Sequence, residues 1–434
     1  MKSRTIILVG ITIVSLFTLQ ASANEYDKYQ DPFFQGVYSI EFQKTKEIEQ
    51  PMVVSPDKTN RGKIIAPFGQ HSTEQSKQEI AKKLNLKGEV FAIIDNTNTI
   101  LVKMDKAEAR RLSKDERVLR ISPVAKTSDF VVQNNSGWGL DRIDETTAVL
   151  NTNYDYTNNG AGRSIWILDT GLDLNNIDVF NEFDGRASVF WDVNGLDGAD
   201  CVGHGTRVSV AAAGETYGVA KGATLVMVKL SNDCTSDRNP GIDIMAFNWI
   251  ATNLPAGTIV NYSRGLHRNG NCTPAFDPAL ENAIIEAHDA GIIVVVAAGN
   301  DGCSADDFSP ANIPEAFVVG ATSNIGLPGQ DRLSWFSRTG ANISSFAPGE
   351  DLRLMDFDGT EVEGTPFEDG TSFSAPYVAG IFAVACQAAG TLCDNTPVAD
   401  LYQTLRNTGT LGTVTNTDGT PLTDATSRFI SQQW

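Results

Sequence analysis

Short apolar runs rich in β-branched residues alternate with helix-forming stretches along the later part of the chain. The runs are Ser164–Leu168, Thr224–Leu230, Thr258–Asn261 and Ile292–Ala298, and the helical stretches are Gly205–Ala213, Ile242–Thr252, Pro278–Ala290 and Ser374–Ala389. Continuous apolar strands are typical of a parallel sheet buried on both faces. The pattern therefore predicts an α/β fold, with a mainly parallel sheet and helices on both faces. Functional side chains in such folds lie at the carboxyl ends of the strands.

A smaller unit precedes this sheet. Its pattern predicts β-α-β-β-α-β order, with strands at 63–66, 89–94, 99–104 and 117–121 and helices at 73–84 and 106–113. That order is the split βαβ arrangement of a ferredoxin-like α+β unit. Residues 24–60 are polar and lack sustained periodicity, so we interpret them as an arm or linker before this unit, which we place at residues 61–127.

The first 23 residues have the features of a secretory signal peptide. Lys2 and Arg4 precede the uncharged run Ile6–Leu19, and the small residues Ala21-Ser22-Ala23 follow it. A membrane anchor is the alternative, but a run of this length is short for a span, which needs about 20 residues. No later stretch looks apolar enough to span a membrane, since the longest uninterrupted apolar run is Ile292–Ala298. We therefore expect a secreted protein with no membrane partner.

Charge is distributed unevenly along the 434 residues, whose formal net charge is -19. Residues 1–127 carry 20 Lys+Arg and 15 Asp+Glu, a net +5, whereas residues 128–434 carry 14 and 38, a net -24. A basic segment thus precedes an acidic body. An acidic body argues against nucleic acid as a partner. Separately, we expect the protein to be a monomer.

All 6 cysteines lie in the acidic body. An even number in an exported chain favours disulfides, and the lack of a CxxC pair argues against a zinc site. Six cysteines allow 15 pairings. We favour the sequential set, Cys201 with Cys234, Cys272 with Cys303 and Cys386 with Cys393; buried free thiols are the alternative.

Three polar residues occupy positions on this scaffold where chemistry is expected. Asp169 ends the first strand of the body, His204 opens a helix in Gly-His-Gly-Thr, and Ser372 begins the long apolar helix in Gly-Thr-Ser-Phe-Ser-Ala-Pro. Each alone is typical of a helix cap or a strand-end polar group. Together they follow the chain order Asp, His, Ser, which is that of subtilisin and differs from chymotrypsin and the α/β-hydrolases.

The sequences around these residues resemble those of the subtilisin-like serine proteases, and most closely the proteinase K and aqualysin-like branch. The resemblance begins at Trp138-Gly139-Leu140-Asp141 and runs to the chain end. The β-α-β-β-α-β unit resembles the inhibitory propeptide of that family. The resemblance therefore implies a propeptide domain at 61–127 and a subtilisin-like peptidase domain at 128–434.

The same resemblance implies a role for each residue of the site. Ser372 would be the nucleophile, His204 the general acid and base, and Asp169 the carboxylate that orients the imidazole. Asn300, after Ala297-Ala298-Gly299, matches the family's side-chain donor to the oxyanion. A turn residue at a strand end is the alternative for Asn300. No catalytic cofactor is implied.

Two segments that form the walls of the substrate cleft depart from the family pattern. Ser263-Arg264-Gly265 stands where the family usually has Ser-Leu-Gly, and Ser236-Asp237-Arg238 stands in a segment that is usually rich in glycine. Substrates of this family add a strand to these segments, and Ala297-Ala298-Gly299 completes the cleft. We predict that Arg264 and Arg238 favour acidic residues on the acyl side of the scissile bond; side chains that turn to solvent are the alternative.

Hard oxygen ligands are concentrated near the start of the body. Asp141, Asp144, Glu145, Asn151 and Asn153 offer the ligand atoms that calcium requires. Their spacing resembles a calcium loop of some aqualysin-like relatives, so a structural calcium ion is expected there. An acidic surface turn is the alternative.

Taken together, these features predict a secreted serine endopeptidase that acts on proteins or peptides through an acyl-enzyme. The resemblance also implies a zymogen that cleaves itself between about Lys126 and Trp138, with its own propeptide as chaperone and inhibitor. The alternative is a catalytically inactive homologue that binds proteins.

Overall fold

The computed structural model describes residues 37–42, 74–94, 99–123, 131–231, 234, 239–266, 272–324, 330–363, 369–410 and 414–422. The chain divides into two units, Met1–Ser128 and Asp129–Trp434. The predicted signal peptide lies outside the described residues, as does most of the polar arm.

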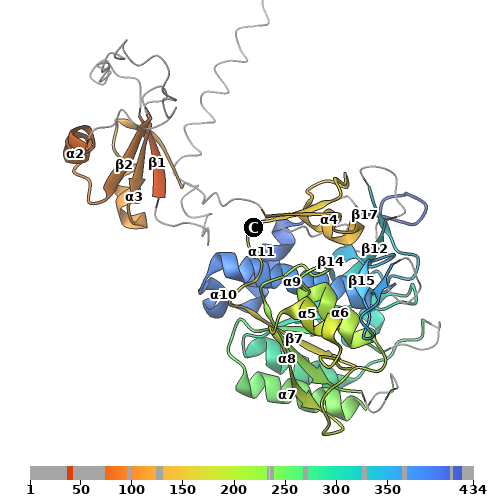
Figure 1. Cartoon of the computed structure of the whole chain (residues 1–434). Coiled ribbons are helices and arrows are strands. Elements are labelled where there is room, and N and C mark those ends of the chain that lie inside the picture. Colours follow the sequence, from red (N-terminus) through yellow and green to blue (C-terminus); the bar gives the residue numbers. More distant parts are fainter. Residues whose placement is uncertain are drawn as a thin grey trace, which may run out of the picture. The chain divides into compact units, whose positions relative to one another are not determined.

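The first unit is an antiparallel sheet with two helices (Figure 1). Its elements are β1 (Val37–Phe42), α2 (Glu74–Lys83), β2 (Glu89–Ile94), β3 (Thr99–Lys103), α3 (Lys106–Leu112) and β4 (Val118–Pro123), and the strand order is β2-β3-β1-β4. Ile100, Val102, Ala109 and Leu112 form a small core with Ile40 of β1. The chain order and the strand order are those of a split βαβ unit.

The first strand of this unit in the structure was not predicted. β1 lies inside the segment interpreted as a polar arm, and it pairs with both β3 and β4, so that Ile40 faces Ile100 on one side and Ile121 on the other. Ile40 is fully buried. A six-residue strand between long polar segments carries too little periodic signal to be found from sequence, and its two neighbours, far along the chain, supply its stability. The predicted strand at 63–66 lies outside the described residues.

The second unit is built on a nine-stranded sheet within the described residues. Its strands are β7 (Ser164–Asp169), β8 (Ala187–Asp192), β9 (Thr224–Lys229), β10 (Ile259–Tyr262), β11 (Ile293–Ala297), β12 (Phe317–Ser323), β13 (Asp331–Leu333), β14 (Ile343–Pro348) and β17 (Val414–Thr415). They follow the order β17-β13-β12-β11-β10-β7-β9-β8, with β14 also on β12, and every pairing is parallel except β12 with β13. The predicted mainly parallel sheet is confirmed.

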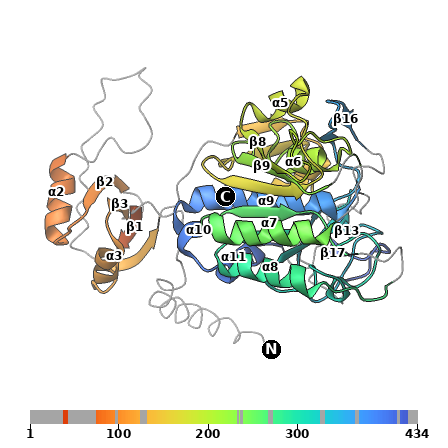
Figure 2. The same ribbon diagram turned by 90° about the horizontal axis from the view of Figure 1, so that it is seen from below.

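Helices cover both faces of this sheet, and Figures 1 and 2 show α6 and α9 on one side and α7 and α8 on the other. These four are α6 (His204–Ala213), α7 (Pro240–Asn253), α8 (Pro278–Asp289) and α9 (Thr371–Ala389). The other described elements are α4 (Trp138–Asp144), α5 (Ile177–Phe183), η2 (Ala305–Asp307), α10 (Leu392–Asn395), α11 (Val398–Thr408), and the two-stranded pairs β5 (Val131–Asn134) with β6 (Asn153–Tyr156) and β15 (Leu354–Met355) with β16 (Glu361–Val362). The four apolar runs and four helices of the sequence pattern are therefore confirmed to within a few residues.

The helix α9 is the most deeply buried element of the site. It is rich in alanine, and 14 of its residues, from Thr371 to Cys386, are buried. Among the described helices, α9 alone has the length and hydropathy that could cross a membrane, with a window that is 72% buried. The expectation that no later stretch is apolar enough was therefore wrong for this segment. Its burial marks it as a core helix, and small residues let it pack closely against α6 and the sheet.

All three predicted disulfides are present. Cys201 bonds to Cys234, Cys272 to Cys303 and Cys386 to Cys393, and no described cysteine is free. The alternative of buried free thiols is wrong for this fold.

Candidate active site

Asp169 lies where the sheet geometry predicts a functional residue, at the carboxyl end of β7. Its side chain is fully buried. One carboxylate oxygen, Oδ1, contacts Nδ1 of His204 at 2.7 Å and accepts a hydrogen bond from the Thr170 backbone N–H, also at 2.7 Å. The structure therefore brings together the first two predicted residues of the site.

The position of His204 depends on a close approach between two backbones. Gly203 caps α6 in the left-handed region, at φ 88, and His204 is the first residue of the helix. A Cβ atom at Gly205 would lie 2.4 Å from the carbonyl oxygen of Gly171, so only glycine fits where α6 meets the loop after β7. This contact holds the imidazole beside the strand end.

Asp200 was not singled out from the sequence, although it organises this corner. It is buried, and it accepts hydrogen bonds from the hydroxyl groups of Thr170 and Thr206 and from the backbone N–H groups of residues 202, 203 and 206, at 2.9 to 3.0 Å. Thr170 in turn accepts the N–H of Gly205 at 2.7 Å. The loop after β7 and the start of α6 are thus tied together through one carboxylate.

Burial by itself would raise the pKa of Asp169. The charge and hydrogen bond of His204, the charge of Arg264 and the N–H of Thr170 outweigh burial, and they hold the pKa of this carboxyl below its usual value. An acid with a lowered pKa is ionised at every pH above its ordinary range. Asp169 is therefore a carboxylate at neutral pH and can stabilise a positively charged imidazole.

Ser372 is the second residue of α9, so its backbone N–H has no acceptor within the helix. The ring of the next residue, Phe373, lies 5.6 Å from the His204 ring between centroids, which places the start of α9 beside the imidazole. The Ser372 hydroxyl donates to the carbonyl oxygen of Ser263 at 3.4 Å, and the Ser263 hydroxyl donates to the Ser372 carbonyl oxygen at 2.7 Å. Rotation about the Cα–Cβ bond of Ser372 would move this hydroxyl away from the Ser263 carbonyl oxygen.

Asn300 follows β11 with its side chain held by one neighbour. Its Oδ1 accepts both the N–H and the hydroxyl of Thr371, at 2.9 and 2.8 Å. The Thr371 hydroxyl also accepts the N–H of Gly299 at 3.0 Å. With its oxygen occupied, the Asn300 amide nitrogen has no acceptor among the described residues and is available to a ligand.

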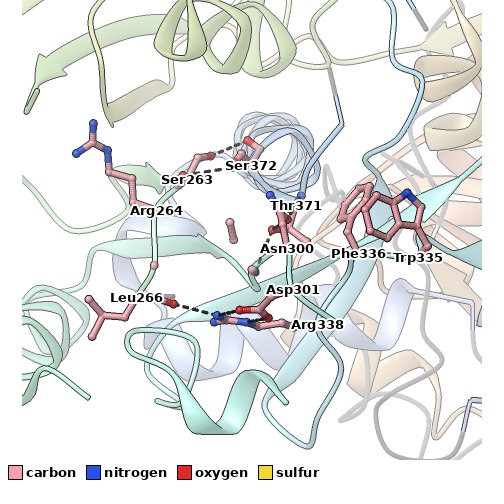
Figure 3. A pocket seen from close by; sticks show the side chains of 13 residues that line it. Ser263, Arg264, Leu266, Asn300, Asp301, Trp335, Phe336, Arg338, Thr371 and Ser372 are labelled. Atoms are coloured by element: carbon pink, nitrogen blue, oxygen red, sulfur yellow. Dashed lines mark hydrogen bonds and ion pairs between the residues drawn. The ribbon is translucent and has the colours of Figure 1, made fainter. Parts of the chain in front are cut away.

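A cavity of about 620 Å³ opens in front of these groups (Figure 3). Seven predicted residues line it: Ser263, Arg264, Gly265, Ala297, Gly299, Asn300 and Ser372. Ala298 was also predicted to face substrate, but it is fully buried. The alternation of a strand explains this correction, because Ala298 points to the opposite side from Ala297. Ser236, Asp237 and Arg238 lie outside the described residues.

The position of Arg264 matches neither a side chain that projects into the cleft nor one that turns to solvent. Its side chain is only 6% exposed, so it neither turns to solvent nor projects freely into the cleft. Nη2 donates to the hydroxyl of Ser231, whereas Nη1 is buried and has no hydrogen-bond partner among the described residues. The Ser231 hydroxyl and the Asp169 charge draw the guanidinium under the wall rather than out of it.

Arg338, which the sequence did not point to, joins the segment that ends at Leu266 to the segment Ala298–Asp301. It is 1% exposed and forms a two-bond pair with the carboxylate of Asp301, at 2.7 and 2.6 Å. Its Nη2 also donates to the carbonyl oxygen of Leu266, its Nη1 to that of Ala298, and its guanidinium stacks 3.6 Å from the ring centre of Phe308. An arginine far along the chain gives no motif that would have revealed this role.

The predicted calcium ligands are partly brought together. Carboxylate oxygens of Asp141, Asp144 and Glu145 lie within 4.8 Å of one another, and the Asn151 side chain bonds to Glu145. Asn153 is next to them, with its N–H on Asn151. Oδ1 of Asp144 is buried and forms no hydrogen bond with any residue that the structure describes. Burial, with the charges of Glu145 and Asp155, raises the pKa of Asp144 from 3.8 to about 7. These residues fit a hard divalent cation.

A buried carboxylate bonded to an imidazole, with a serine at the start of a neighbouring helix, supplies the three groups of a serine hydrolase with an Asp-His-Ser triad. The model of the subtilase family matches residues 160–426, which is more than half of the chain. The protein therefore belongs to the subtilase family, as the motifs predicted.

Several relatives are known by sequence. An extracellular serine proteinase of Thermus sp. (strain Rt41A) is 37% identical over 290 residues, which cover 66% of this chain and 66% of the relative. Alkaline serine exoprotease A of Vibrio alginolyticus is 34% identical over 63% of this chain and 47% of the relative. The chain thus spans between about half and two thirds of the length of these proteins.

One solved structure supports both the fold and the family. It is a cold adapted subtilisin-like serine proteinase, and the two chains superpose with a TM-score of 0.59 at 31% identity, covering 69% of this chain and 100% of the other.

Proposed function

We propose that this protein is a secreted serine endopeptidase that cleaves peptide bonds in proteins and peptides. The observation that carries the proposal is the 2.7 Å contact between the buried Asp169 and His204, beside a cavity lined by Ser372 and Asn300. The extracellular relatives in Thermus and the signal-like first 23 residues support secretion. The protein acts as a monomer and needs no catalytic cofactor.

Each group has a distinct task in this reaction. Ser372 Oγ attacks the scissile carbonyl carbon as its proton passes to Nε2 of His204, and Asp169 stabilises the imidazolium through Nδ1–H. The negative oxygen that forms accepts hydrogen bonds from the Asn300 amide and the Ser372 N–H. His204 then gives its proton to the leaving amine, and water releases the acyl group by the same steps in reverse. The Ser372 hydroxyl turns from Ser263 to His204 when substrate binds.

The deciding experiment replaces the nucleophile. Ser372→Ala, assayed on a chromogenic peptide anilide, should lose at least about ten-thousandfold in kcat/KM. Ser374→Ala is the matched control, since its hydroxyl lies two residues further along α9 and is buried without a hydrogen bond. A serine-directed phosphonate should label the control and not Ser372→Ala. A processed wild-type protein that binds peptides but leaves them intact would support the alternative, an inactive homologue.

The first unit is the inhibitory propeptide in this proposal. Its split βαβ order matches the propeptides that the family resemblance implies, and its net charge of +5, signal included, is opposite to the -24 of the second unit. Opposite charges speed the association of two partners. The chain cleaves itself between Lys126 and Trp138, so Ser372→Ala should accumulate at full length. Amino-terminal sequencing and intact mass of the secreted protein measure this directly.

Arg264 lines the cavity although its side chain is buried, and it makes the enzyme favour acidic residues on the acyl side of the scissile bond once its guanidinium turns toward the substrate. A guanidinium nitrogen that is buried without a partner gains a charge-assisted hydrogen bond when a carboxylate reaches it. Burial makes that gain larger than it would be in water.

A structural calcium ion would be held by Asp141, Asp144 and Glu145, with Asn151 and Asn153 beside them. Its charge would neutralise three carboxylates that crowd one another and fix the start of the second unit. It takes no part in the chemistry at Ser372.

A further inference from the structure

Trp335 is an apolar side chain in an unusual position. It is 75% exposed, the highest value among the exposed large hydrophobic side chains of the described residues. It nevertheless lines the same cavity as Asn300 and Ser372. Figure 3 shows Trp335 and Phe336 on one side of Asn300, and Ser263, Arg264 and Leu266 on the other. The indole therefore stands at the end of the cavity opposite the Ser263–Leu266 wall.

The backbone under the indole is tied to the segment that carries Asn300. Gly302 N–H donates to the Phe336 carbonyl oxygen at 2.8 Å, and Arg338 N–H donates to the Gly299 carbonyl oxygen at 3.0 Å. The Phe336 ring is only 5% exposed and supports the indole edge-on, at 83° with 5.6 Å between centroids. A buried aromatic base thus presents the open face of the indole at a fixed place relative to Asn300.

The direction of the substrate, which rests on the proposed function, decides what reaches this face. The acyl side of the substrate adds a strand along Ser263–Gly265, and the scissile carbonyl lies between Ser372 and Asn300. The residues that leave as the amine therefore continue past Asn300 toward Trp335. At about 3.3 Å per residue in an extended chain, the first two of them lie within reach of the indole.

We propose that Trp335 forms a subsite for a bulky apolar or aromatic side chain in the first or second residue after the scissile bond. Aromatic side chains supply a large rigid contact area at low conformational cost. The charged groups nearest this end of the cavity, Asp301 and Arg338, are bonded to each other at 2.6 Å and leave no net charge to attract a charged side chain. Trp335 thereby sets specificity on the leaving-group side, independently of Arg264.

The test compares two kinds of substrate with the same acyl side. Internally quenched peptides carry glycine, leucine, phenylalanine or lysine at either of the first two positions after the scissile bond, whereas a peptide methyl ester places only a methoxy group there. For the mature wild-type enzyme, leucine or phenylalanine should raise kcat/KM about three- to tenfold over glycine. Trp335→Ala should abolish that preference and leave hydrolysis of the methyl ester within about twofold, and Trp335→Phe should keep most of the preference.

Trp249→Ala is the matched control, because Trp249 is 39% exposed on α7 and does not line the cavity. It should keep the full preference. Release of the acyl-enzyme by added leucinamide relative to glycinamide gives a second readout of the same subsite. An unchanged preference in Trp335→Ala, an equal loss on the methyl ester, or a lysine preference in the wild type would overturn the proposal. Failure of the wild type to cleave both the ester and the peptides would instead refute the proposed function.

Discussion

The two halves of the active site are held in different ways. On one side, the segments that carry Asp169 and His204 are tied together by Asp200, which alone accepts five hydrogen bonds from three neighbouring segments. On the other side, Ser372 and Asn300 depend on a helix start and on a single neighbour, Thr371. The first half contains buried charge, and the second contains donors left open to the cavity.

The difference follows from what each half must do. A buried charge is stable only where hydrogen bonds and an opposite charge support it, and Asp169 has this support at Oδ1, while Oδ2 has no hydrogen-bond partner among the described residues. The Asn300 amide nitrogen must instead stay free until substrate arrives, and the Ser372 hydroxyl must leave its long bond to Ser263, so both are positioned from behind. Replacements should therefore act on the acid and base in one half, and on the oxyanion and the substrate in the other.

The largest effect is expected in the first half. Asp169→Asn keeps the shape of the side chain but no longer stabilises the imidazolium, so kcat should fall about ten-thousandfold with KM nearly unchanged. Steady-state kinetics on a peptide anilide, after removal of the propeptide by traces of wild-type enzyme, measure the loss. A fall confined to KM would show that the carboxylate positions substrate instead.

A smaller effect is expected in the second half. Asn300→Ala removes one oxyanion donor, a change that costs subtilisin, a protein of this family, about a hundred- to a thousandfold in kcat. Thr371→Val is the comparison, since it removes the hydroxyl that holds Asn300 Oδ1 and leaves the donor in place. It should cost about tenfold. Equal losses in the two variants would contradict the separate roles of donor and support.

Specificity should change more than chemistry when the wall is altered. Arg264→Leu should lower kcat/KM about tenfold more for peptides with an acidic residue on the acyl side than for neutral peptides, whose cleavage also slows because Arg264 helps to hold the pKa of Asp169 down. Arg332→Leu, outside the cavity, is the control. A peptide library with no acidic preference in the wild type would refute the role of Arg264.

The smallest effect on activity is expected outside both halves. The pKa of Asp144 is about 7 in the folded chain without calcium, against 3.8 in the unfolded chain. Between these values the folded chain binds more protons than the unfolded chain. The free energy of unfolding therefore falls as pH rises from about 4 to about 7. Bound calcium should cancel that fall. Melting curves with calcium and with a chelator should therefore diverge across this window, while kcat at low temperature stays constant. Melting curves that coincide at every pH would refute the proposed calcium site.

The sequence predicted what local patterns encode. Apolar runs revealed the buried strands, and the residues flanking Asp169, His204 and Ser372 revealed the site. β1 was missed because its pairing partners lie some sixty and eighty residues away. Arg338 and Trp335 were missed for a similar reason, since only the folded chain brings them to the cavity. The burial of Arg264 depended on Ser231, a neighbour that no spacing rule connects to it.

The disulfide between Cys201 and Cys234 joins the loop before His204 to the segment after β9. This bond forms only where the surroundings are oxidising. In the secreted zymogen proposed above, the loop before His204 would therefore be fixed only after export, which would add a chemical safeguard to the one that a propeptide provides. The reducing cytoplasm would then protect the producing cell in addition to inhibition.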